Sequence, residues 1–435
     1  MDDRAPRSAN AAPSAADHVF IALLWFAFYA QWLSIVPTVV PQQVAVILGS
    51  KGTIKAGVSG TILAAGALVS LLVTPIAGGL SDRRRAPAVR RRPFVVLGML
   101  GSCLTLALLS RFGAGSSLML YALAFLCLQF WWNWAAGPYA GLISDLVPQA
   151  ARNTASAWMN VMSVSGTIAG NLVLYLLYKP ERPAMAFEVL IAIGLACLIL
   201  TLWRVDERPI TRANPPFRMG GFLASFLVSP RKHANFYWVL VTRLFSNMGI
   251  WSVFTFLLFY LGDVIGVARP ERVLPALLAV GAVIAIPASF IGGRMATRRG
   301  VVPVVTATSW VMAAAAVTIA LIAFAPSLWL AAPIVVSFSA CAGAYQAVDW
   351  ALALAVLPSA EDAGKDMGIW HVSMVLPQVL GPATTGWLIS WLAAAASGRV
   401  AYTVAFGIAA FWFVLAAALI RFVRLPAPAQ PARDP

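Results

Sequence analysis

Charged residues are scarce in this chain. Asp, Glu, Lys and Arg make up only 11% of the 435 residues, while hydrophobic residues make up 60% and the mean hydropathy is +0.82. A soluble globular protein carries about a quarter charged residues, so this class is excluded. The net charge of +15 would suit nucleic-acid binding only if the basic residues gathered on one folded face. They occupy short segments between apolar runs instead, so no nucleic-acid partner is expected.

Other kinds of site are missing as well. The four cysteines lie inside apolar segments without paired spacing, so the sequence suggests neither a disulfide framework nor a metal cluster. The chain has no phosphate-binding loop of a primary pump and no paired His and acidic residues of an intramembrane enzyme. We therefore expect no enzyme, no cofactor and no metal, and any transport must be driven by an ion or solute gradient.

Long apolar runs are what the sequence does have. A bilayer core of about 30 Å needs about 20 apolar residues in a helix. Twelve runs of this kind predict an all-α membrane protein with 12 transmembrane helices. They lie at 19–39, 56–80, 93–110, 118–147, 155–178, 183–203, 236–262, 273–296, 301–324, 327–357, 366–393 and 399–423.

The longest connection divides these helices into two sets of six. It is rich in Pro and Arg, and we interpret it as a linker on an anionic cytoplasmic surface. The predicted organisation is an N-terminal bundle at 1–203, a linker at 204–235, a C-terminal bundle at 236–424 and a disordered tail at 425–435.

The distribution of Lys and Arg predicts the orientation, because basic residues resist translocation. With both termini inside, the cytoplasmic segments hold about 22 of the 31 Lys and Arg residues and the outer segments about 8. We expect a multi-pass protein of the cell membrane, inner or plasma, with both termini in the cytoplasm.

The two halves resemble each other. Leu63–Ala67 leads to Gly78–Arg84 in the first half, and Leu278–Ala282 leads to Gly292–Arg299 in the second. Each stretch ends the second helix of its half. Such a repeat is typical of transporters built from two related bundles.

The Gly-x-Leu-Ser-Asp-Arg-Arg-Arg segment at Gly78–Arg85 resembles the signature loop of the major facilitator superfamily. This resemblance implies two pseudo-symmetric six-helix bundles, with the first, fourth, seventh and tenth helices lining a central cavity. It also implies a gate formed by the signature loops and the loop after the fourth helix. The gate candidates are Asp82, Arg83, Arg84, Arg152 and Arg298.

A narrower resemblance points to one branch of that superfamily. Arg90–Phe94 and Gly137–Leu146 are similar to segments of the sucrose transporters and the glycoside, pentoside and hexuronide cation symporters. The resemblance places Asp145 on their proton-linked aspartate. The second helix lacks the acidic pair that binds sodium in relatives of the melibiose carrier. This absence favours protons over sodium as the coupling ion. Asp145 has two interpretations: a proton carrier, or part of a charge network with Arg152 or the Asp82 loop that latches the gate.

Asp349 and Arg243 are charges placed deep in predicted helices. Asp349 lies about 13 Å from the cytoplasmic end of the tenth helix, and Arg243 about 10 Å from the same end of the seventh. A charge inside a membrane is a functional candidate by default. The two residues are predicted to form an ion pair, which either couples transport to protons or fixes the packing of the two helices.

Amides and aromatic rings in the cavity helices are the candidate ligands for a solute. Sugars pack their C–H faces on aromatic rings and exchange hydrogen bonds with amides in a largely apolar pocket. The predicted substrate-binding residues are Gln31, Gln129, Asn133, Trp134, Asn247 and Gln346.

Together these features predict a monomeric secondary transporter that moves a small polar solute, a sugar or glycoside, by proton-coupled alternating access. Two alternatives remain. An exporter of amphipathic compounds would use the same fold with a more aromatic cavity. A non-transporting sensor would need an output domain, for which neither tail is large enough.

Overall fold

The protein is described here by a computed structural model, which covers residues 14–49, 54–83, 90–148, 151–205, 207, 234–356 and 363–423. All regular elements in this part of the chain are helices. Twelve of the helical segments are long and apolar enough to cross a membrane, which confirms the predicted spans.

The N-terminal bundle holds the first six spans. The first span consists of three consecutive pieces, and each of the others is one helix. They are α1 (Ala15–Ser34), the π-helix η1 (Ile35–Val39), α2 (Val40–Leu48), α3 (Lys55–Arg83), α4 (Arg92–Leu109), α5 (Leu118–Leu146), α6 (Arg152–Leu177) and α7 (Ala184–Arg204).

The C-terminal bundle holds the other six. They are α9 (Ala234–Asp263), α10 (Pro270–Arg299), α11 (Val301–Ile322), α12 (Leu328–Val356), α13 (Ala363–Ala395) and α14 (Gly398–Leu419), followed by the short 3-10 helix η4 (Ile420–Phe422).

The first span shows how the sequence sets local structure. Ser14 begins α1 with a capping box, in which its hydroxyl accepts from the Asp17 backbone N–H and the Asp17 carboxylate accepts from the Ser14 N–H. Pro37 lies in η1, where a proline removes a backbone donor from the helical ladder. A wider π turn is a common response to such an interruption. The span therefore changes helical geometry halfway along its length.

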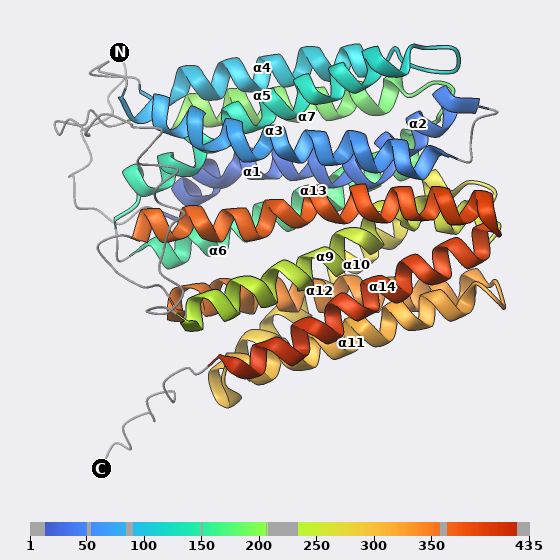
Figure 1. Cartoon of the computed structure of the whole chain (residues 1–435). Coiled ribbons are helices and arrows are strands. Elements are labelled where there is room, and N and C mark those ends of the chain that lie inside the picture. Colours follow the sequence, from blue (N-terminus) through green and yellow to red (C-terminus); the bar gives the residue numbers. More distant parts are fainter. Residues whose placement is uncertain are drawn as a thin grey trace.

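The buried apolar residues form two clusters, and each is drawn almost entirely from one bundle. Figure 1 shows the two bundles side by side, with the start of α1 and the end of α14, the described helices nearest the two chain termini, at one end of the molecule. We call this the termini end; the loop between α4 and α5 lies at the opposite end. The bundles meet chiefly where α3 packs against α13 and α6 packs against α10. Most of the predicted linker and the whole predicted tail lie outside the described residues.

Candidate functional site

Arg243 and Asp349 form an ion pair inside the C-terminal bundle. The Nε atom of Arg243, on α9, lies 2.8 Å from Oδ2 of Asp349, on α12. The side chains are only 4% and 2% exposed. The structure thus brings together the two charges that the sequence places at similar depths.

The surroundings of this pair link three helices. Tyr345, one turn before Asp349 on α12, donates a long 3.4 Å hydrogen bond to Oδ1 of Asp349. Arg243 donates to the Ser373 hydroxyl on α13 at 3.2 Å, and Asn247 donates to the Arg243 carbonyl at 3.0 Å. A change in the charge of Asp349 would therefore alter the ion pair and the hydrogen bonds that connect α9, α12 and α13.

A second charge cluster occupies the termini end of the N-terminal bundle. Asp145, near the end of α5, accepts from Nη2 of Arg90 at 2.6 Å and from Nε of Arg91 at 2.7 Å. Asp82, at the end of α3, lies 2.8 Å from Nη2 of Arg91. Asp145 thus pairs with arginines of the loop that follows Asp82. This is the contact expected of a charge network that latches the gate, one of the two interpretations of Asp145.

Arg91 is the centre of this cluster and fills its available space. It is 5% exposed, and its Nη1 donates to the carbonyl of Pro138 within α5. A Cβ atom added to Gly141 would lie 1.5 Å from that same nitrogen. Only glycine at position 141 therefore admits the guanidinium to the surface of α5.

Glu207 completes the cluster and was not predicted. Its carboxylate accepts from the backbone N–H groups of Arg90, of Arg91 at 2.8 Å and of Arg92 at 2.7 Å. These groups begin α4, whose N-cap residue Arg91 has no side-chain cap of its own. Glu207 supplies the negative charge that a helix N-terminus favours, from just past the sixth span. The available signal was an uncapped helix start with an acidic residue following another span.

We expect Asp145→Asn to lower the stability of the N-terminal bundle. The amide loses charge-assisted hydrogen bonds to two arginines, and each bond to a charged group contributes about 1.5–3 kcal/mol. Thermal unfolding in detergent should show a lower midpoint than wild type. Glu188→Gln, at an exposed position on α7, is the matched control and should leave the midpoint unchanged. Equal midpoints for both variants would show that the cluster contributes nothing to stability.

The remaining gate candidates divide into two groups. Arg298 is exposed at the end of α10. Arg84 lies outside the described residues, and so do the side chains of Arg83 and Arg152. Of the two gate candidates whose side chains the structure describes, Asp82 lies in the charge cluster and Arg298 does not.

The two amides of the polar wall predicted on α5 both contact α3. The Asn133 amide oxygen accepts from Ser70 at 2.8 Å and from Thr74 at 2.9 Å, both on α3. Gln129 is buried beside Gly66 of the same helix. The helix–helix contacts of these amides are therefore with α3.

Trp134 faces elsewhere on α5. Its ring stacks on Phe94, at the start of α4, with 5.5 Å between ring centroids, and on Phe130 at 5.4 Å. Asn133 and Trp134 are adjacent residues, so the helical rotation of 100° per residue turns them toward different neighbours.

The other three candidate ligands also differ in environment. Gln31 is fully buried, donates to the Leu190 carbonyl on α7 at 3.0 Å and accepts from Trp132 at 2.8 Å. Asn247 is buried beside Arg243, whereas Gln346 is exposed on α12. Of the six predicted ligands, Asn247 and Gln346 lie on the helices that carry the ion pair.

At the end opposite the termini, a surface ion pair joins the bundles. Lys55, which begins α3, lies 2.6 Å from Oδ1 of Asp263, which ends α9. The Lys55 ammonium also lies 4.9 Å from the centre of the Phe259 ring, and Tyr402 donates to Oδ2 of Asp263 at 3.0 Å. This group connects one residue of the N-terminal bundle to three of the C-terminal bundle.

Polar contacts between α3 and α13 lie near the same end. Trp387 donates to the Thr61 hydroxyl at 2.9 Å, and the backbone N–H of Gly57 donates to the Ser390 hydroxyl at 2.9 Å. On the first span, η1 and α2 pack against α9, while α1 packs against α6 and α7 of its own bundle. The end of the first span nearer the termini thus makes its main contacts within the N-terminal bundle.

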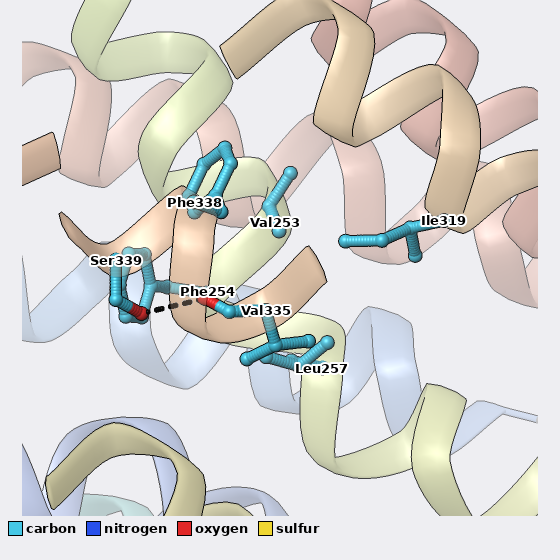
Figure 2. A pocket seen from close by; sticks show the side chains of 7 residues that line it. All are labelled: Val253, Phe254, Leu257, Ile319, Val335, Phe338 and Ser339. Carbon is cyan, nitrogen blue, oxygen red and sulfur yellow. Dashed lines mark hydrogen bonds between the residues drawn. The ribbon is translucent and has the colours of Figure 1, made fainter. Parts of the chain in front are cut away.

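Figure 2 shows a small recess within the C-terminal bundle. It is lined by Val253, Phe254, Leu257, Ile319, Val335, Phe338 and Ser339. The one hydroxyl, on Ser339, donates to the Val335 carbonyl of its own helix at 2.9 Å. The recess is a gap in apolar packing, and its lining lacks the convergent polar groups of a sugar site.

Sequence comparison decides the family. The model of the Major Facilitator Superfamily matches residues 21–363. The chain belongs to this superfamily. Solved structures agree on the fold: the POT family transporter PepTSo aligns with a TM-score of 0.74 at 11% identity, covering 94% of this chain and 98% of that one. The nucleoside transporter NupG aligns with a TM-score of 0.68 at 12% identity, covering 93% and 98%.

Among curated proteins, this major facilitator resembles sucrose transport proteins over part of its length. SUT5 of Oryza sativa subsp. indica is 24% identical over 198 residues, which cover 37% of each chain. SUT4 of the same plant is 27% identical over 182 residues, covering 33% of this chain and 30% of SUT4. The match thus spans only 37% of SUT5 and 30% of SUT4. The coarser prediction, a multi-pass membrane protein of a transporter family, is confirmed.

Proposed function

We propose that this protein moves a small polar solute of the sugar or glycoside class across the cell membrane, driven by protons and working by alternating access. The buried pair of Arg243 and Asp349 carries the proposal. Charges are costly inside a membrane and are usually retained for a function. The partial similarity to sucrose transport proteins supports the choice of solute.

In the proposed cycle, Asp349 takes up a proton and so loses its charge-based attraction to Arg243. The arginine then depends more on Ser373, on α13, to which it already donates a hydrogen bond. Further along α13 lie Trp387 and Ser390, which contact α3 of the other bundle. Protonation at the pair is thereby transmitted to the helix that joins the two bundles.

The contacts at the end opposite the termini support a state closed at that end. If the basic residues place the termini in the cytoplasm, the Lys55–Asp263 pair closes the outer side. Releasing this pair and the α3–α13 contacts would open the outer side during the cycle. The protein is proposed to act as a monomer, because both bundles of the alternating unit are in one chain.

Ligand-induced stabilisation tests the solute class. Purified protein should unfold at a higher temperature in the presence of a disaccharide such as sucrose, because a ligand that binds only the folded state stabilises it. Mannitol at equal osmolarity is the control for general solvent effects. The rival proposal, an exporter of amphipathic compounds, is favoured by the aromatic residues of α5 and predicts stabilisation by lipophilic cations instead. Stabilisation by such cations and not by any disaccharide would overturn the sugar proposal.

A further inference from the structure

The signature segments of the two halves differ in charge at their ends: the first contains an aspartate beside its arginines, and the second contains arginines without that aspartate. In the N-terminal bundle, Asp82 pairs with the arginines of the following loop. In the C-terminal repeat the corresponding residue is Thr297, and its hydroxyl donates to the Gly293 carbonyl of its own helix. The neighbouring Arg294, Arg298 and Arg299 are all exposed. Positive charge thus accumulates at the termini end of α10 without the aspartate that its counterpart contains.

These arginines continue an exposed apolar face of the same helix. Phe290 is 74% exposed and Ile291 is 60% exposed, and Val283 and Ile284 extend the face toward the opposite end. At 100° per residue, Arg294 and Arg298 lie on the side of α10 that Phe290 occupies. We call the set of Val283, Ile284, Phe290, Ile291, Arg294 and Arg298 the α10 stripe.

The α10 stripe faces away from the protein. Gly281 and Gly292, on the opposite side of α10, lie against Ser339 and Ala344 of α12. By contrast, Arg294 and Arg298 are themselves exposed. The stripe therefore has open space beside its arginines.

We propose that the α10 stripe binds an anionic phospholipid. Its phosphate group would contact Arg294 and Arg298, and one acyl chain would lie along Phe290, Ile291 and the apolar residues beyond them. Charge complementarity selects an anionic head group, since each basic residue at a membrane surface contributes favourably to binding acidic lipid. The apolar continuation lies within a membrane span, so a phosphate that reaches the arginines along this face is attached to an acyl chain. This inference is independent of the transported solute.

Native mass spectrometry of the full chain, with phosphatidylglycerol or phosphatidylcholine added to the detergent micelles, tests the proposal. Wild type should retain phosphatidylglycerol in preference to phosphatidylcholine. The R294Q/R298Q variant should bind phosphatidylglycerol about tenfold more weakly and lose the preference. The matched control is R111Q/R399Q, which removes the same charge at exposed positions of the opposite end and should keep the preference.

Three results would overturn the inference: no preference in wild type, an unchanged preference in R294Q/R298Q, or an equal loss in R111Q/R399Q. Glycerol phosphate provides a further arm, because it carries the head-group charge without an acyl chain. It should not compete with phosphatidylglycerol at equal concentration. Full competition would show that the apolar part of the stripe does not contribute and would also contradict the proposal.

Discussion

Replacement of Asp349 by Asn should abolish proton-driven uptake and leave solute exchange intact. Asparagine resembles the protonated aspartic acid in shape and is permanently neutral, so the loaded carrier can still alternate. Net uptake requires the unloaded carrier to return after releasing its proton, and asparagine has none to release. The measurement compares uptake into proteoliposomes under an imposed pH gradient with exchange against internal unlabelled solute.

A second variant guards against a folding defect. Removing one partner of a buried pair leaves an unpaired charge and costs about 3–5 kcal/mol. The double variant D349N/R243Q removes both charges and should recover most of this loss, as judged by thermal unfolding. It should still lack proton-driven uptake. Proton-driven uptake at the wild-type rate in either variant would show that the pair is only structural.

The Gly60→Ala variant should shift the protein toward a state open at the end opposite the termini. A Cβ atom at position 60 on α3 would lie 2.1 Å from the backbone carbonyl oxygen of Pro382 on α13, in the other bundle. A backbone atom cannot rotate away, so the two helices must separate. Overpacking of this kind costs about 1–3 kcal/mol, which shifts a two-state equilibrium about 5- to 150-fold.

Distances between spin labels would show the shift. Labels at Ala114 and Ala325, exposed in loops of the two bundles, should move apart in Gly60→Ala in a background without native cysteines. Gly78→Ala is the matched control on the same helix, because its added Cβ would meet nothing nearer than 3.9 Å. An unchanged distance distribution in Gly60→Ala, or an equal change in Gly78→Ala, would contradict closure through the α3–α13 contact.

The spans were predictable because they depend on one dominant energy term. Burying an unpaired backbone polar group in lipid is so costly that long apolar segments must be helical. The proximity of Arg243 and Asp349 also followed from simple geometry, since helix rise converts sequence position into depth. Two opposite charges at one depth in a medium of low polarity are expected to pair, because pairing lowers the free-energy cost of burying them.

The direction in which a polar residue faces was much harder to predict. In a soluble helix the apolar side identifies the core, whereas in a membrane helix both the lipid-facing and the protein-facing sides are apolar. Nothing in the sequence around Asn133 shows that Ser70 and Thr74 of α3 occupy its amide oxygen. Gln31 likewise finds its acceptor, the Leu190 carbonyl, on a helix far along the chain.

Glu207 escaped prediction for a different reason. It lies just after a span in a segment interpreted as a linker, and its partners are backbone N–H groups more than a hundred residues earlier. Nearly every residue type has the same backbone N–H group, so the sequence does not show which of these groups a carboxylate will bind. The only local sign was that the N-cap residue of α4, Arg91, has no side chain that can accept from the first backbone N–H groups of the helix. An acceptor for these groups must then come from another part of the chain.

The most direct test of the central claim is proton movement driven by the solute alone. Proteoliposomes with a pH-sensitive dye inside, no initial pH gradient and a clamped membrane potential receive an inward gradient of sucrose or another disaccharide. The account predicts that the interior becomes acidic as solute enters with protons, and that Asp349→Asn abolishes this acidification while the solute still exchanges. Entry of solute without acidification in the wild-type protein would contradict proton coupling.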